Sequence, residues 1–200
     1  LFQYGRSWEW GVPTNPNGPV AHSGSKVWAR DLKGNYGNNE DGYITSPSID
    51  LSSLAGQTPV LSWWQWLRSE PLHDHGSVEV SRNGGGVWTS VYDNTGDADP
   101  LWARREATLD STYAVSDFRF RFRFRSDDSS VFPGYFVDDV AISTVESPGS
   151  TVYAQDFEAS DGGFALTIAS YGQTVSLASP GAGTSAVPVS GEVSGLTCST

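Results

Sequence analysis

The sequence predicts an all-β fold, an antiparallel jelly-roll β-sandwich, and three observations support this prediction. Residues 118–125 alternate phenylalanine and arginine without a break. Because successive side chains of a strand point to opposite faces, this segment places its phenylalanines on one face and its arginines on the other, as in a sheet buried on one side only. The 22 glycines and 11 prolines indicate many turns between short strands. No window shows the apolar spacing of an amphipathic helix.

Eight segments have the residue pattern of strands with turn signals between them, a number that suits a jelly roll. They are residues 26–30, 42–45, 60–67, 77–82, 87–92, 104–109, 118–125 and 135–142. The run Asn83-Gly84-Gly85-Gly86 separates two of them. Because glycine readily adopts positive φ, this run predicts a β-hairpin.

Composition excludes some functional classes. The net charge of -11 and the pI near 4.5 argue against a nucleic-acid partner, because binding phosphates requires a clustered cationic excess. No apolar run is long enough to span a bilayer, so we expect no membrane insertion. Cys198 is the single cysteine, which excludes an internal disulfide. The chain starts at Leu1 and contains no methionine, as expected for a piece of a larger exported protein.

Seven stretches in residues 8–145 together resemble one family. They are Trp8-Glu9-Trp10-Gly11-Val12-Pro13, Ala21-His22-Ser23-Gly24, Val27-Trp28-Ala29, residues 38–51, residues 61–66, Val78-Glu79-Val80-Ser81 and Phe136-Val137-Asp138-Asp139-Val140. The family is that of the MAM-like and cleaved-adhesin jelly-roll domains, which accompany secreted bacterial metallopeptidases, adhesins and other exoproteins. The resemblance implies a secreted, extracellular module.

Such domains begin with a strand that carries an Asp-Phe-Glu element, and here this element occurs late, at Asp156-Phe157-Glu158. We therefore expect a jelly-roll domain over residues 1–147 and a segment over 148–177 that completes its sheet. The Ser/Gly/Pro-rich residues 178–200 are interpreted as a linker or tail. Two alternatives stay open: the late segment closes the sheet within its own chain, or it is donated to a neighbouring molecule and causes self-association.

The resemblance also implies a structural Ca²⁺ near Asp138 and Asp139, with Asp156 and Glu158 as partners if the late segment returns to the sheet. Calcium binds oxygen ligands, and several carboxylates can share one ion. Asp41, in the oxygen-rich loop 38–41, is a further candidate ligand. The alternative is that these acids are solvated turn residues or pair with the arginines of residues 118–125.

Candidate ligand-binding residues are aromatic and cationic. Tryptophans exposed on a sandwich can stack on sugar faces, and guanidinium groups match the carboxylates or sulfates of an acidic glycan. The candidates are Trp66, Trp88, Trp102, Arg119, Arg121 and Arg123. For the tryptophans the alternative is packing in the core. For the arginines it is pairing with acids on neighbouring strands, for which Glu79 and Glu106 are suitably placed.

We therefore expect a non-catalytic, calcium-stabilised module of a secreted multidomain chain, which recognises a glycan or an extracellular protein or tethers a catalytic domain. The rival hypothesis is a jelly-roll polysaccharide hydrolase or lyase, for which Glu70 and Asp74 are the nominated carboxylate pair. No nucleophile elbow, zinc-peptidase helix or phosphate loop is present. His73 and His75 have too few partners for a zinc site and are interpreted as surface loop residues.

Overall fold

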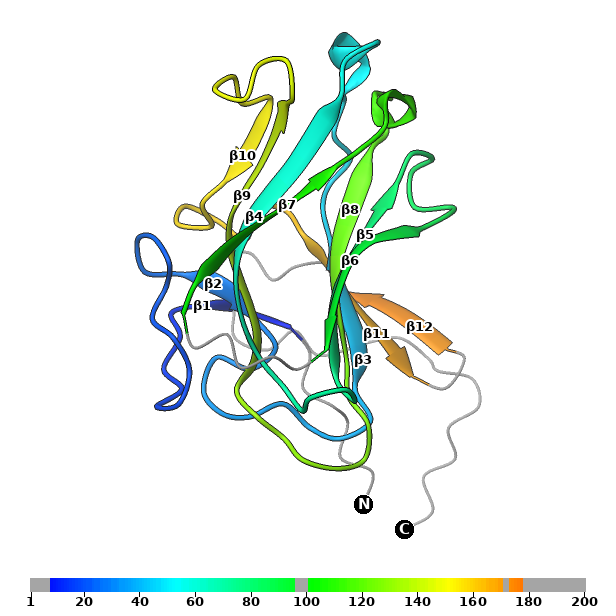
Figure 1. Cartoon of the computed structure of the whole chain (residues 1–200). Helices are drawn as coiled ribbons and strands as arrows, with labels where there is room; N and C mark the ends of the chain where they lie inside the picture. The colour runs from blue at the N-terminus through cyan, green and yellow to red at the C-terminus, as the bar shows by residue number, and fades with distance from the viewer. Residues whose placement is uncertain (1–7, 96–100, 171–172, 178–200) are drawn as a thin grey trace.

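The alternating segment forms strand β8 (Arg119–Arg125), as predicted. Phe118, Phe120, Phe122 and Phe124 are fully buried, while the intervening arginines stay partly exposed. The structure is a computed structural model that describes residues 8–95, 101–170 and 173–177. Two antiparallel sheets face each other (Figure 1), which confirms the predicted all-β sandwich. The phenylalanines belong to the core cluster of buried residues. The predicted tail, residues 178–200, lies outside the described residues.

Sheet A has the strand order β1-β2-β9-β4-β7, with β10 paired to β9. Its strands are β1 (Glu9–Gly11), β2 (Val27–Ala29), β4 (Pro59–Arg68), β7 (Ala103–Thr108), β9 (Gly134–Thr144) and β10 (Tyr153–Gln155). The pairing of β4 with β9 shifts register between Ser62 and Trp64. Such a bulge bends the strand and re-aims the side chains beyond it.

Sheet B has the strand order β12-β11-β3-β8-β5-β6. Its strands are β3 (Asp41–Thr45), β5 (His75–Ser81), β6 (Thr89–Thr95), β8, β11 (Ala165–Ser170) and β12 (Gln173–Leu177). The predicted hairpin joins β5 to β6, and Gly84 and Gly85 have positive φ there, at 67° and 96°. All eight predicted strands are present, with shifts of a few residues at their ends.

Short 3-10 helices at Ser52–Leu54 and Ser111–Tyr113 are the helical elements in the part of the chain that is described. No helix in these residues has the length and apolar character that crossing a membrane requires.

Residues 148–177 contribute to both sheets of the same chain. Strand β10 pairs with β9 in sheet A, and β11 pairs with β3 in sheet B. Between these strands Phe157 and Phe164 are fully buried, and their ring centroids lie 5.5 Å apart. The ring of Phe164 also lies 5.5 Å from that of Phe120, so this segment packs directly on the phenylalanines of β8.

A buried ion pair ties the loop before β3 to the end of β2. Arg30 and Glu40 are 2% and 4% exposed, and the guanidinium donates hydrogen bonds to the Glu40 carboxylate. The guanidinium carbon lies 5.9 Å from the ring of Trp8 and 5.8 Å from that of Phe124. The other Glu40 oxygen accepts from the Gly37 N–H at 2.6 Å. Loop 38–41, of which Asp41 was a candidate cation ligand from the sequence, thus uses Glu40 to neutralise a buried arginine.

Candidate functional site

The outer face of sheet A carries aromatic and charged side chains on its two central strands. On β4 the inward residues Trp63 and Leu67 belong to the core between the sheets. The alternation of the strand therefore turns Trp64, Trp66 and Arg68 outward. Opposite them on β9, Phe136 pairs with Trp66 and Asp138 pairs with Trp64, according to the register of the two strands.

A groove of about 560 Å³ opens on this face beside Trp66. Its lining comes from the chain before β2, the end of β4 and the start of β7, and comprises Pro16, Asn17, Gly18, Pro19, Val20, Trp66, Arg68, Leu101 and Trp102. Most of this lining is apolar, and two of its side chains are strongly exposed: Val20 at 79% and Leu101 at 75%. Exposed apolar groups gathered in a groove are a feature of ligand-binding surfaces.

The two groove tryptophans are held in place by different contacts. Trp66 packs edge-on against Phe136, with ring centroids 5.5 Å apart, and is 5% exposed. Trp102 is half-buried, and its indole N–H donates to the backbone oxygen of Val20 at 2.8 Å. This bond fixes the Trp102 ring against residues 16–20, so the groove has an ordered aromatic wall.

His22 connects the groove to a group of carboxylates further along the same face. Its imidazole stacks on Trp64 with a centroid distance of 3.8 Å and meets the edge of Trp102 at 5.8 Å. Its Nδ1 lies 2.5 Å from Oδ2 of Asp139. Residues 16–26, which we call the clasp loop, therefore line the groove with their first part and contact carboxylates with their second part.

Asp138 is completely buried under the clasp loop. Its Oδ2 accepts from the backbone N–H groups of His22 at 3.1 Å and Ser23 at 3.2 Å, and its Oδ1 accepts from the N–H of Asp139 at 2.9 Å. Burial, and then the charge of Asp139, raise the pKa of Asp138 to about 7. A carboxylate held this way is costly to ionise unless a cation lies near it.

Glu158 reaches the same loop from the segment after β10. Its Oε1 accepts from the N–H groups of Ser25 at 2.9 Å and Lys26 at 2.7 Å, and its Oε2 accepts from the Ser25 hydroxyl at 3.1 Å. These backbone bonds lower the pKa of Glu158. Gly24 has a φ of +54°, and a Cβ there would lie 2.2 Å from the carboxylate carbon of Glu158. The close approach of loop and carboxylate therefore requires glycine.

Two residues beside this site adopt backbone conformations that are unusual for their type. Asp139 has a φ of 45°, and the buried Phe157 has a φ of 58°. Left-handed backbone at such residues costs of order 1–3 kcal/mol and occurs mostly where function or packing requires it. Asp139 lies within β9, where the register against β4 shifts, and Phe157 lies in the segment after β10. The carboxylates of Asp138, Asp139 and Glu158 contact the clasp loop from these two segments.

These oxygen donors have the chemistry that a hard cation requires. Carboxylates from β9 and from the segment after β10 meet the clasp loop, where the Ser23 hydroxyl donates to Asp139 Oδ1 at 2.9 Å. Calcium binds carboxylate and hydroxyl oxygens of this kind. Among the described residues, however, the group that brings three carboxylate oxygens within 4.8 Å of one another is Glu70, Asp74 and Asp127, so a calcium ion at Asp138, Asp139 and Glu158 stays a prediction. Of the other predicted ligands, Asp156 is exposed nearby and accepts from the Glu158 N–H at 3.1 Å.

Asp41 lies away from this group, on β3 of sheet B. Its carboxylate forms a two-pronged ion pair with Arg123, at 2.8 and 2.7 Å. Arg121 pairs with Glu79, as the sequence suggested, and Arg119 pairs with Asp117. The other acid proposed as a partner for these arginines, Glu106, pairs instead with Arg104 on its own strand β7.

Trp88 joins this sheet B surface and takes no part in the groove. Its ring lies 4.3 Å from the guanidinium of Arg121, and Tyr43 lies 4.2 Å from the same group. Trp66 and Trp102 therefore lie together at the groove of sheet A. Trp88 lies on sheet B, where its ring packs on Arg121 and the arginines of β8 pair with acids.

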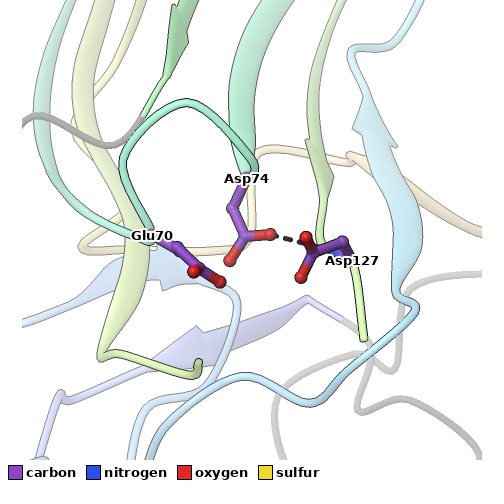
Figure 2. Close-up of side chains that lie close together, drawn as sticks. All are labelled: Glu70, Asp74 and Asp127. Atoms are coloured by element: carbon purple, nitrogen blue, oxygen red, sulfur yellow. Dashed lines mark hydrogen bonds between the residues drawn. The ribbon is translucent and has the colours of Figure 1, made fainter. Parts of the chain in front are cut away.

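A second acidic cluster lies where the β4–β5 turn meets the segment after β8. Glu70, Asp74 and Asp127 each place a carboxylate oxygen within 4.8 Å of the others, and Figure 2 shows the three side chains converging. Asp74 is fully buried: its Oδ1 accepts from the Asp127 N–H at 2.9 Å and its Oδ2 from the Tyr36 hydroxyl at 2.5 Å. Burial, and the bond to Asp74, raise the pKa of Tyr36.

This arrangement gives Asp74 a structural role in joining three loops. Both of its oxygens are engaged and none of its surface is exposed, so it lacks the access to substrate that a general acid or base needs. Glu70 is partly exposed and accepts from the Ser129 hydroxyl at 2.6 Å. The histidines of this region are also surface residues: His73 contacts Asp127 at 3.2 Å, and His75 contacts Asp93 at 2.7 Å.

Sequence reasoning missed two parts of the site. His22 belongs to one of the stretches that carry the family resemblance, but nothing in its neighbours indicated the stack on Trp64. The apolar loop residues of the groove, such as Val20 and Leu101, carry no pattern of their own and become a surface only when the fold brings them to Trp66.

No family model matches the chain. Over 150 residues it is 35% identical to Bacillopeptidase F of Bacillus subtilis (strain 168), a match that covers 73% of this chain and 10% of that protein. The chain thus spans about a tenth of the length of the curated relative it matches. The MAM-like part of the resemblance stays a prediction.

Solved structures similar to this chain include adhesin and carbohydrate-binding domains. The K2 cleaved adhesin domain of Lys-gingipain has a TM-score of 0.44 at 20% identity, with 68% of this chain and 81% of that one covered. TmCBM61 in complex with β-1,4-galactotriose has a TM-score of 0.40 at 14% identity, with 68% and 88% covered. The CBM22-1 xylan-binding domain from Paenibacillus barcinonensis Xyn10C has a TM-score of 0.38 at 13% identity, with 72% and 88% covered.

Proposed function

We propose that this chain is a non-catalytic recognition module of a secreted multidomain protein, that it binds a glycan in the groove beside Trp66 and Trp102, and that a structural Ca²⁺ stabilises it. The observation that carries the proposal is the clasp loop, which forms one wall of an aromatic groove and is anchored by buried carboxylates. The 35% identity to a part of Bacillopeptidase F supports a position beside a peptidase in a longer chain.

The buried state of Asp74 supports a binding role over the hydrolase or lyase alternative. Glycoside hydrolysis needs two carboxyl groups about 5–10 Å apart on either side of the sugar bond, both within reach of it. Asp74 is enclosed and fully hydrogen-bonded, and the described lining of the groove contains no carboxylate. The groove therefore has features suited to holding a ligand, and none of the described side chains there has the chemistry to cleave it.

Glycan binding in the groove is tested by substituting alanine for one tryptophan on each face of the sandwich. We expect Trp102→Ala to lose binding on a glycan array, because the variant removes the aromatic wall and its bond to Val20. Trp88→Ala is the matched control, since this ring packs on Arg121 of sheet B and should leave binding unchanged. Equal loss in both variants would contradict the assignment of the groove. Release of reducing or unsaturated sugar ends by the unaltered protein would support the enzyme alternative.

Calcium binding is tested by thermal unfolding with and without a chelator. A ligand that binds only the folded state stabilises it by about 2.7 kcal/mol at a free concentration of 100 times its Kd. We expect calcium to raise the Tm of the unaltered protein and to have no effect on Asp138→Ala. Asp127→Asn is the control, because Asp127 belongs to the second acidic cluster. If Asp127→Asn alone abolishes the calcium effect, the ion is bound at that cluster and our assignment is wrong.

The same experiment has an expected pH dependence. Without calcium the folded protein binds a proton at Asp138 with a pKa of about 7, above the usual value of 3.8. This contribution to stability is present below the usual pKa and is lost as the pH rises through about 7. Calcium instead favours the ionised carboxylate, so the rise in Tm on adding calcium should be larger at pH 8 than at pH 5.

A further inference from the structure

Arg68 is the one cation in the groove, and it has no acidic partner among the described residues. It is the last residue of β4, its side chain is exposed, and it lines the groove with Trp66. The carbon of its guanidinium lies 5.9 Å from the centre of the Phe132 ring. A cation–π contact of this kind restrains the side chain but leaves its hydrogen-bond donors available.

The arginines of β8 differ from Arg68 in this respect. Each of the four contacts a carboxylate: Arg119 that of Asp117, Arg121 that of Glu79, Arg123 those of Asp41 and Glu79, and Arg125 that of Asp93. In a chain of net charge -11, carboxylates for pairing are plentiful. Arg68 has an exposed side chain and faces a groove whose described lining has no carboxylate, so a carboxylate of a bound ligand would find an accessible guanidinium there.

We infer that the groove is specific for a carboxylated sugar, a polyuronate, with Arg68 binding the carboxylate while a sugar ring lies against Trp102. This inference rests on the proposed function, which names the groove but not the charge of its ligand. Trp66 and Arg68 stand two residues apart on β4, or about 7 Å along the strand. Trp66 itself is 5% exposed, so the accessible aromatic ring in the groove is that of Trp102, and the guanidinium fork of Arg68 matches a planar carboxylate.

The lining favours a sugar over an acidic peptide. A peptide carries an N–H and a C=O at every residue, and these groups need partners when they are covered. Binding by strand addition supplies such partners only at a sheet edge, whereas β4 has β9 and β7 on its two sides. Besides Arg68, the polar side chain in the described lining is Asn17. A sugar ring can lie with its apolar face on the groove and its hydroxyl groups in water.

The test measures affinity by calorimetry for three carboxylated oligosaccharides: an oligogalacturonate, an oligoguluronate and a glucuronate-bearing xylan fragment. Each is compared with its carboxyl-reduced, neutral counterpart. We expect at least one charged form to bind about tenfold more tightly than its neutral form, as a hydrogen-bonded charge pair predicts. Arg68→Gln should remove this preference, so that the charged and the neutral form bind this variant with equal affinity.

Two further variants distinguish a two-pronged contact between the Arg68 guanidinium and a carboxylate from a general effect of positive charge. Arg68→Lys keeps the charge but loses the two-pronged geometry, so it should retain only part of the preference. Arg82→Gln removes one exposed positive charge after β5, where Arg82 donates to Thr112 at 2.9 Å, and should leave the preference intact. If Arg82→Gln and Arg68→Gln reduce it equally, the effect is general and the inference is wrong.

The remaining outcomes distinguish this inference from the proposed function. If charged and neutral sugars bind equally well and Trp102→Ala abolishes the binding of both, Arg68 does not select a carboxylate. The proposal that the groove binds glycans would then still hold. Tighter binding of sulfated than of carboxylated sugars would also overturn the inference about Arg68. If no sugar binds and an acidic peptide does, both the inference and the proposed glycan ligand fail.

Discussion

A chain that ends at Ser147 will not fold into a stable sandwich. The truncation removes Phe157 and Phe164, which are fully buried against the phenylalanines of β8. Loss of a buried phenylalanine side chain typically costs about 3–5 kcal/mol, and two such losses approach the roughly 5–15 kcal/mol that stabilises a whole domain. It also removes the backbone oxygen of Asp161, which accepts from the Trp28 indole at 3.0 Å. Near-UV circular dichroism and urea unfolding measure the result.

A chain that ends at Leu177 is the control for this truncation, because it keeps β10, β11 and β12. We expect it to unfold cooperatively like the full chain. Adding a synthetic peptide of residues 148–177 to the short chain should restore its near-UV spectrum, as strand complementation predicts. Cooperative unfolding of the short chain at the Tm of the full chain would show that residues 1–147 form a sufficient core by themselves.

Glu40→Gln will destabilise the protein by about 3–5 kcal/mol, because it leaves the charge of a buried arginine without its carboxylate. Both members of the Arg30–Glu40 pair are almost fully buried, and Arg30 lies among aromatic rings. Glutamine keeps the shape of the side chain, so the effect reports charge. Urea unfolding at neutral pH measures it.

Arg123→Ala is the control for Glu40→Gln, because it breaks a partly exposed ion pair with Asp41 on the outer face of sheet B. Such pairs contribute about 0–1 kcal/mol. We therefore expect a much smaller loss of stability from this variant. Similar losses from the two variants would mean that burial of the Arg30–Glu40 pair has no special importance for the fold.

The fold could be predicted because its strongest signals are local. Alternation over residues 118–125 specifies a strand and its two faces, and the glycines at 84–86 specify the hairpin beside it. Both depend on backbone geometry within a few residues. Strands β1, β11 and β12 were not among the predicted strands, since segments of three to six residues carry little signal by themselves.

The site was predictable only in part because it is assembled from distant segments. Trp66 and Trp102 were identified by residue type, but the contact of Trp102 with Val20 spans 82 residues. Asp138 and Glu158 were named through the family resemblance. Which arginines have an acidic partner among the described residues depends on the acids that the fold places near them. Pairing across sheets and loops is a property of the tertiary structure and has no local sequence pattern.

The clasp loop has a consequence for where the module works. Under the proposed function, the same eleven residues, 16–26, shape the ligand wall and sit on the carboxylates that hold the ion. Extracellular calcium modules typically bind the ion with a Kd of about 10⁻⁴–10⁻³ M, far above the concentrations at which cytosolic sensors respond. If the proposed calcium site and glycan groove are both correct, affinity for the ligand would rise only at extracellular calcium concentrations, and glycan binding before export would be weak.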